Sequence, residues 1–151
     1  MRLENSFEVA APADAAWRLL TDVPTVVPCM PGAELVEVVG ANAWKATLHV
    51  KLGAIALRFL ADVTREEMDE AAGRVVLAVK AREARGRGSA DATMDSLVAD
   101  VNGGTRIDVT TELTLRGAVA QYGRGIVADV ASQLTTRFAD CLARKLAETP
   151  T

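Results

Sequence analysis

Residues 106–148 have the sequence RIDVTTELTLRGAVAQYGRGIVADVASQLTTRFADCLARKLAE. Up to Arg116, apolar residues alternate with polar ones, which is the period of a strand with one buried face. After Gly117 the apolar residues recur every three or four positions, which is the period of a helix. The predicted helical stripe contains Ala120, Gly123, Val127, Val130, Leu134, Phe138 and Cys141. A helix that reaches about residue 148 from this point is over roughly 40 Å long, and a sheet covers it only by curling around it.

The same alternation fills the segment that precedes this strand and predicts five more strands. Turn signals at residues 40–42, 53, 69–73, 86–88 and 102–104 separate these strands. Trp44 and Leu48 fall on one face of their strand, whereas Lys45 and His49 fall on the other, which directs His49 to solvent. The other residues expected to point inward are Ala46, Val50, Leu57, Phe59, Ala61, Val63, Val75, Leu77, Val79, Ala81, Ala92, Met94, Val98, Ile107, Val109, Leu113 and Leu115.

The N-terminal region predicts a strand followed by two short helices. Alternation over residues 2–10 indicates the strand, and Pro12 suits the first turn of a helix that ends near Thr21. Three prolines between Asp22 and Gly32 allow only a short helical turn there. The order of elements predicts an α+β protein with a curved seven-stranded antiparallel sheet around a long C-terminal helix, as one domain over residues 1–151.

Composition excludes several classes of partner. The net charge is −3, and acidic and basic residues are interspersed, so no basic cluster points to nucleic acid. No window approaches the roughly 20 apolar residues that span a bilayer, and the N-terminus lacks the apolar region of a signal peptide. We therefore expect a cytoplasmic protein. Aromatic residues make up only 4% of the chain, so Val, Leu and Ala must fill the interior.

The two cysteines and the single histidine argue against a metal centre. Cys29 and Cys141 lie far apart in the chain, and their spacing fits neither a metal site nor a disulfide-rich secreted framework. We expect both to be reduced packing residues. His49 is the only histidine, and zinc sites without several His or Cys ligands are rare.

Several local motifs resemble those of a known family. The order of elements is similar to the helix-grip order of the START-like, or birch-allergen-like, superfamily. Within it, the chain resembles the CoxG family, which is named after the G-subunit of carbon monoxide dehydrogenase. The segments that carry this likeness are Phe7, Pro12, Trp17-Arg18-Leu19-Leu20-Thr21-Asp22, Cys29-Met30-Pro31-Gly32-Ala33-Glu34-Leu35, Lys51-Leu52-Gly53-Ala54-Ile55, Gly88-Ser89-Ala90 and Leu115-Arg116-Gly117-Ala118-Val119-Ala120-Gln121-Tyr122-Gly123-Arg124.

The resemblance implies a non-catalytic accessory protein of a molybdenum hydroxylase such as carbon monoxide dehydrogenase. It implies a role in maturation, membrane recruitment or delivery of electrons to quinone, and a peripheral position at the inner face of the membrane as an alternative location. Many members of the family carry a C-terminal extension that attaches to a membrane. This sequence ends at Thr151 without one, which argues against direct anchoring.

A cavity is expected between the concave face of the sheet and the helix stripe, and it would bind an apolar molecule such as a quinone or a lipid. Ala120 and Gly123 remove volume from the stripe, although Gly117, Gly123 and Gly125 would equally serve close packing or fraying at the helix start. Ser96 and Thr111 offer polar anchors. The expected ligand-binding residues are Trp44, Phe59, Leu77, Met94, Val109, Thr111, Leu113, Gly123, Val127, Val130 and Leu134.

Two alternatives to a carrier remain at this point. One is a docking protein whose core is completely filled. The other is an aromatase/cyclase-like enzyme, which rests on superfamily analogy alone. No nucleophile motif is present, and Asp62, Asp95 and Glu112 fall on the solvent face, so the alternation predicts no inward acidic residue and no catalytic site.

Overall fold

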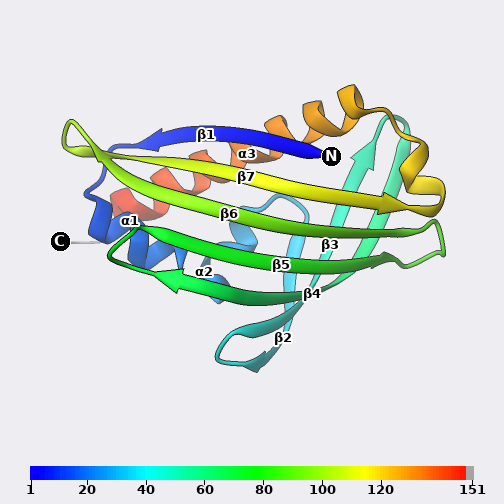
Figure 1. Cartoon of the computed structure of the whole chain (residues 1–151), viewed down its shortest axis with the longest axis horizontal. Helices are drawn as coiled ribbons and strands as arrows, with labels where there is room; N and C mark the ends of the chain where they lie inside the picture. Colours follow the sequence, from blue (N-terminus) through cyan, green and yellow to red (C-terminus); the bar gives the residue numbers. More distant parts are fainter. Residues whose placement is uncertain (149–151) are drawn as a thin grey trace.

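The computed structural model describes residues 1–148 and contains one seven-stranded antiparallel sheet with the strand order β1-β7-β6-β5-β4-β3-β2 (Figure 1). The helix-grip fold and the predicted order of elements are confirmed. The strands are β1 (Arg2–Val9), β2 (Ala33–Gly40), β3 (Ala43–Leu52), β4 (Ile55–Asp69), β5 (Arg74–Glu83), β6 (Ser89–Val101) and β7 (Gly104–Arg116). The helices are α1 (Ala13–Leu20), α2 (Val23–Val26), η1 (Val27–Cys29), η2 (Gly117–Gln121) and α3 (Arg124–Glu148).

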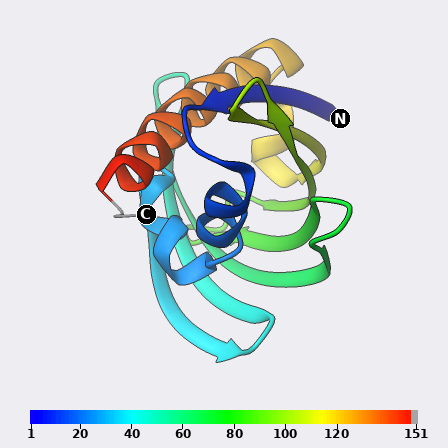
Figure 2. The same cartoon turned by 90° about the vertical axis from the view of Figure 1, so that its left-hand side faces the viewer.

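The sheet curls because a single helix has to cover a wide apolar face. Seven strands that lie about 4.8 Å apart form a sheet roughly 30 Å wide, whereas a helix with its side chains is about 10–12 Å across. In Figure 2 the sheet wraps around the interior, and α3 closes the ring between β1 and the strand pair β2–β3. The backbone of α3 comes close to β1 and to β3, which are separated in the sheet by four other strands.

The pairing register confirms which side chains share the inner face. Leu77 on β5 lies opposite Met94 on β6, Met94 lies opposite Thr111 on β7, and Thr111 lies opposite Leu3 on β1. One continuous row of inward residues therefore crosses four strands. His49 is exposed on the outer face, as the alternation predicted.

The long helix begins later than its hydrophobic period suggests. Gly117 has a φ of +78°, and a Cβ there would lie 2.8 Å from the Cα of Gly88, so the chain turns sharply at a position suited to glycine. Residues 117–121 then form the separate short helix η2, and α3 starts only at Arg124. The 25 residues of α3 make it about 37 Å long, which is shorter than predicted.

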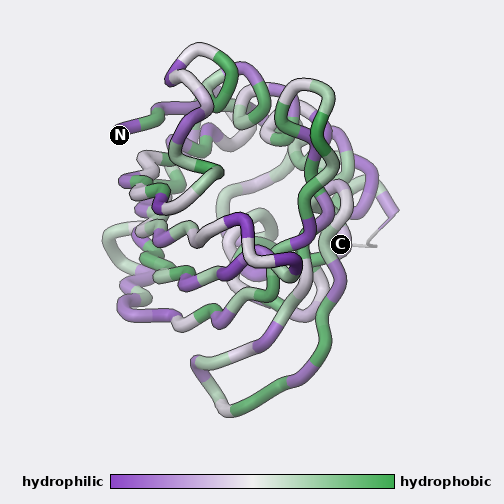
Figure 3. The backbone as a smooth tube through the Cα atoms, turned by 90° about the vertical axis from the view of Figure 1, so that its right-hand side faces the viewer, coloured by the Kyte–Doolittle hydropathy of each residue, from purple (hydrophilic) through white to green (hydrophobic). Residues whose placement is uncertain are grey.

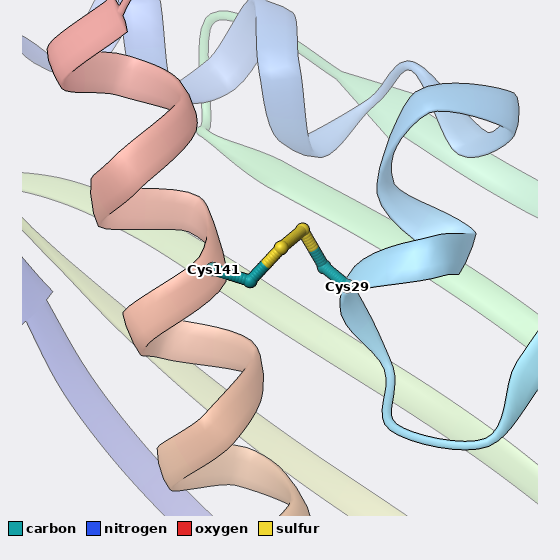
Figure 4. Close-up of a disulfide and its surroundings, with 2 residues drawn as sticks. All are labelled: Cys29 and Cys141. Carbon is teal, nitrogen blue, oxygen red and sulfur yellow. A yellow bond between two sulfur atoms is a disulfide. The ribbon is translucent and has the colours of Figure 1, made fainter.

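The expectation that both cysteines are reduced is wrong in this structure. Cys29 at the end of η1 and Cys141 on α3 form a disulfide, with their Cα atoms 5.4 Å apart (Figure 4). Cys29 is 3% exposed, and α3 packs against both η1 and α1 at this end of the molecule. The bond therefore ties the proline-rich segment after the first helix to the C-terminal half of α3.

We expect the disulfide to contribute strongly to stability, because it joins residues 112 positions apart. Closing a loop of this length in the unfolded chain is worth about 4–5 kcal/mol in the chain-entropy model. The double variant Cys29→Ser/Cys141→Ser should lose about this much free energy of unfolding in guanidinium titrations. Dithiothreitol should lower the free energy of unfolding of the wild type to that of the variant, and it should leave the free energy of unfolding of the variant unchanged. Equal stability of both oxidised proteins, or two titratable thiols in the native wild type, would contradict the bond.

Candidate ligand-binding site

Two clusters of buried core residues lie at opposite ends of the interior. At the η2 end, Leu52, Leu57, Phe59 and Val119 form one cluster, and Val130 of α3 packs against it. At the α1 end, the second cluster packs against the other end of α3. It consists of Val9, Ala16 and Ile107, with Phe7, Leu20, Val98, Val109 and Leu146 around it. The two clusters thus fill opposite ends of the space between sheet and helix.

Between the two clusters lies a band of inward side chains that stay half-buried, and we call this region the central hollow. A filled core would hide these side chains from solvent, as Ile107 is hidden at 0% exposure. Figure 3 views the molecule from its η2 end and shows that apolar and polar residues alternate along much of the backbone that surrounds the interior. The half-buried residues of the central hollow are Ala61, Val63, Leu77, Val79, Ala92, Met94, Ser96, Thr111, Leu113 and Leu134.

The structure separates the predicted ligand-binding residues into three groups. Leu77, Met94, Thr111, Leu113 and Leu134 lie together in the central hollow. Five others belong to the closed ends or border them. Phe59 and Val130 belong to the η2 end, Val109 belongs to the α1 end, and Val127 and Trp44 are buried.

Gly123, the eleventh predicted residue, is not part of this space. It is exposed and precedes the first turn of α3, and a Cβ built there meets no atom within 4 Å. Ala120 lies in η2 and is also exposed. The interpretation that these two residues enlarge a cavity is therefore wrong, because neither contributes to the stripe of α3.

Arg65 is an inward residue that the sequence interpretation missed. Its guanidinium donates to the backbone oxygen of Thr21 at 2.8 Å and to Oδ1 of Asn42 at 3.0 Å, and it lies 5.2 Å from the ring centroid of Trp44. Trp44, predicted to contact a ligand, is 5% exposed and lies against this arginine. Arg65 thus joins the end of α1 to the β2–β3 turn and holds the α1 end of the fold closed.

Replacing Arg65 by lysine should cost about 2 kcal/mol of unfolding free energy, because an ammonium group cannot reproduce the planar set of donors that spans three partners. Urea titrations followed by tryptophan fluorescence would measure this loss. Arg58→Lys on the outer face of the same strand is the matched control and should change stability little. A loss of equal size in the two variants would show that the contacts of Arg65 are not the cause.

Glu83 corrects the prediction that no acidic side chain points inward. It lies opposite Phe59 in the sheet and is 3% exposed. Its carboxylate accepts hydrogen bonds from the backbone N–H groups of Arg58 at 3.0 Å, Arg85 at 2.8 Å and Arg87 at 3.4 Å. These donors, Arg58 first, lower the pKa of Glu83 below its ordinary value. The group stays ionised at neutral pH and fastens the β5–β6 turn, so it is not a general acid.

The lowered pKa makes part of the stability depend on pH. A carboxyl whose pKa is lower in the folded state stabilises the fold fully above its unfolded pKa, near the ordinary 4.5, and loses this contribution as pH falls through the folded pKa. Glu83→Gln should therefore be less stable than wild type at pH 7, and the difference should shrink steadily below about pH 4.5. Thermal unfolding from pH 7 to pH 3 measures it. If the difference in stability between Glu83→Gln and the wild type did not change with pH, the loss would come from altered packing or hydrogen-bond geometry and not from the charge of Glu83.

Two openings lie toward the η2 end of the molecule. One, with a volume of about 550 Å³, lies between β1 and the start of α3 and is lined by Arg2, Leu3, Glu4, Asn5, Arg124 and Ala128. The other, of about 400 Å³, is lined by Ile55, Leu57, Arg87, Ala118, Val119, Gln121 and Tyr122. The first is lined by Leu3 and Asn5, which lie opposite Thr111 and Val109 on the inner face of the sheet. Neither of these two openings is lined by a residue of the central hollow.

Residues 1–148 contain no group of three or more His, Cys, Asp or Glu side chains that is arranged to hold a metal ion. Within the same range, none of the helices combines the length and apolar character needed to cross a bilayer.

The family model of the carbon monoxide dehydrogenase G-subunit (CoxG) matches residues 6–147. The chain belongs to this family. The match covers almost the whole sequence, including the Cys29–Gly32 motif, η2 and α3. The resemblance drawn from the sequence motifs is therefore confirmed for this CoxG-family chain.

Solved structures show the same fold at low sequence identity. A conserved protein from Geobacillus kaustophilus superposes with a TM-score of 0.87 at 21% identity, covering 98% of this chain and 96% of that one. The ZhuI aromatase/cyclase from Streptomyces sp. R1128 gives 0.66 at 16%, covering 97% and 93%. Ara h 8.0201 gives 0.64 at 13%, covering 99% of both chains. No curated protein matches the sequence significantly.

Proposed function

We propose that the protein is a non-catalytic carrier that binds an apolar molecule, a quinone or a lipid, in its central hollow. The observation that supports this most directly is the band of inward apolar side chains that remain half-buried between two closed core clusters. Apolar surface left accessible inside a fold is stabilised when a guest covers it. Membership of the CoxG family further supports a place beside a molybdenum hydroxylase such as carbon monoxide dehydrogenase, in its maturation, membrane recruitment or electron delivery.

The size of the guest follows from the energetics of burial. A ligand that buries about ten methylene groups gains about 8 kcal/mol, while association itself costs about 4–15 kcal/mol. A short ligand therefore binds weakly in this hollow. A long-chain or polycyclic molecule has enough surface to bind well, and an apolar guest of this kind needs a carrier because it is poorly soluble in water.

The residues of the interior favour binding over catalysis. Glu83 is held by three backbone donors, and His49 lies on the outer face. Thr111 and Ser96 are the hydroxyl groups of the central hollow, and within residues 1–148 neither has a base beside it that would make it a nucleophile. These features do not supply the acid and base that a cyclase needs.

Native mass spectrometry of gently purified protein tests the proposal first. We expect a co-purifying apolar molecule, and the emptied protein should bind a long-chain quinone or a lipid again in solution. A protein that is purified empty and binds neither class would leave the docking role as the better explanation.

A bulky substitution inside the central hollow separates a carrier from a filled core. Ala92 on β6 is half-buried and lies opposite Val79 and Leu113. In a hollow interior, Ala92→Phe should change stability by less than about 1 kcal/mol and weaken ligand binding at least tenfold, whereas overpacking a filled core costs about 1–3 kcal/mol. Ala99→Phe, on the exposed face of the same strand, is the matched control and should change neither quantity. Marked destabilisation by Ala92→Phe alone would support the filled core.

A further inference from the structure

Three neutral polar side chains lie next to one another on the inner face of the sheet, beside the central hollow. Asn5 on β1 and Ser96 on β6 both lie opposite Val109, one on each side of it. Thr111 is the next inward residue on the same strand as Val109, so it is a diagonal neighbour of both. Diagonal neighbours in an antiparallel sheet have Cβ atoms no more than about 7–8 Å apart. Thr111 is therefore within reach of a small ligand group together with either neighbour, whereas Asn5 and Ser96 lie on either side of Val109, about 10 Å apart across two strand spacings. We call the three side chains the polar patch.

The side chains of the polar patch have no hydrogen-bond partner within residues 1–148. Two other hydroxyl groups do have partners: Thr105 donates to the backbone oxygen of Ala11 at 2.7 Å, and Thr135 donates to that of Ala131 at 2.8 Å. A polar group in an apolar space is costly unless it is hydrogen-bonded. The polar patch thus has unused donors and acceptors that face the hollow instead of the protein.

Asn5 of the polar patch also lines the opening of about 550 Å³ between β1 and the start of α3. Leu3, which lines the same opening, begins the inward row Leu3, Thr111, Met94 and Leu77, which crosses the sheet from β1 to β5. The polar patch therefore lies at the β1 side of a mostly apolar inner face.

We infer that the polar patch binds the head of the guest, which is an uncharged group with carbonyl or hydroxyl oxygens, while an apolar tail extends along the row toward β5. This inference rests on the proposed function. An amide and two hydroxyls both donate and accept hydrogen bonds, so they suit carbonyl and hydroxyl oxygens. None of the three carries a charge to balance a carboxylate or a phosphate. At the outer part of the opening, the guanidinium of Arg2 forms ion pairs with the carboxylates of Glu4, at an N–O distance of 3.2 Å, and of Glu112, at 3.9 Å.

Three aromatic probes of similar size test the inference on the full-length protein. Dimethylnaphthoquinone carries two carbonyl oxygens, dimethylnaphthalene is the same ring system without them, and naphthoate carries a carboxylate. Titrations followed by tryptophan quenching or probe fluorescence give the three affinities. We expect the wild type to bind the quinone about tenfold more tightly than the hydrocarbon, and to bind naphthoate more weakly than the quinone.

Variants then assign the preference to the polar patch. Thr111→Val keeps the shape of the side chain and removes its hydroxyl, so it should weaken quinone binding about fivefold and leave hydrocarbon binding unchanged. Asn5→Leu should act in the same direction. Thr110→Val, one residue away on the outer face of β7, is the matched control and should change neither affinity. Circular dichroism verifies that each variant is folded.

The possible failures are distinguishable. Equal affinity for the quinone and the hydrocarbon, or an equal loss of both in Thr111→Val, would overturn the role of the polar patch and leave the carrier proposal standing. Tighter binding of naphthoate than of the quinone would also overturn it and would assign the head to Arg124 at the opening. If none of the probes binds, the proposed function itself fails, and the inference fails with it.

Discussion

The structure depends on one constraint, which is that a single helix has to complete the interior of a sheet about three times its own width. The sheet meets this constraint by curling until α3 comes close to both β1 and β3. The inner faces of the strands between them then lie across the interior from the helix. At the η2 end and the α1 end, helices or turns add a further layer, and the side chains of the sheet contact those of α3 there. In the middle, the small side chains Ala61 and Ala92 leave the inner surface accessible.

The two ends of the interior are held by different contacts. The α1 end is held by the disulfide between Cys29 and Cys141 and by Arg65, which fastens the end of α1 to the β2–β3 turn. At the other end, the first turn of α3 is joined to β1 by a hydrogen bond from Arg124 to the backbone oxygen of Arg2 at 3.0 Å. Gly123 and Gly125 have no packing neighbours where side chains would project. The helix is therefore fixed near its C-terminus and held more lightly where the larger opening lies.

Much of the fold could be predicted because it depends on local patterns. Period-two alternation, Pro12 and the glycine-containing turns placed the strands, the first helix and the outward direction of His49 correctly. The central part of the candidate site followed from the same alternation, since Leu77, Met94, Thr111 and Leu113 are inward on neighbouring strands. Whether a guest binds there is a separate question, because accessibility does not identify what covers a surface.

The features that could not be predicted depend on tertiary contacts or on breaks in a pattern. Nothing in the spacing of Cys29 and Cys141 shows that η1 and α3 meet. The apolar period of the sequence begins right after Gly117, but residues 117–121 form the separate short helix η2 and α3 starts only at Arg124. The period therefore predicted Gly123 on the helical stripe, although it lies before α3. Arg65 and Glu83 differ in kind, because the predicted inward alternation stopped at Val63 and Ala81, and one further step of the same period puts both on the inner face. A charged side chain is normally expected to point outward. Here backbone N–H groups donate hydrogen bonds to the carboxylate of Glu83, and the guanidinium of Arg65 donates to the backbone oxygen of Thr21 and to the side chain of Asn42.

The disulfide also bears on how the protein is made. Its two sulfurs belong to residues 29 and 141, so the covalent ring encloses the whole six-stranded meander. This ring cannot close until synthesis has passed residue 141, after all seven strands have been made. An oxidant must then be available to the polypeptide, although the reducing cytosol disfavours such bonds. The redox state of this crosslink in the cell would consequently report the compartment in which folding ends.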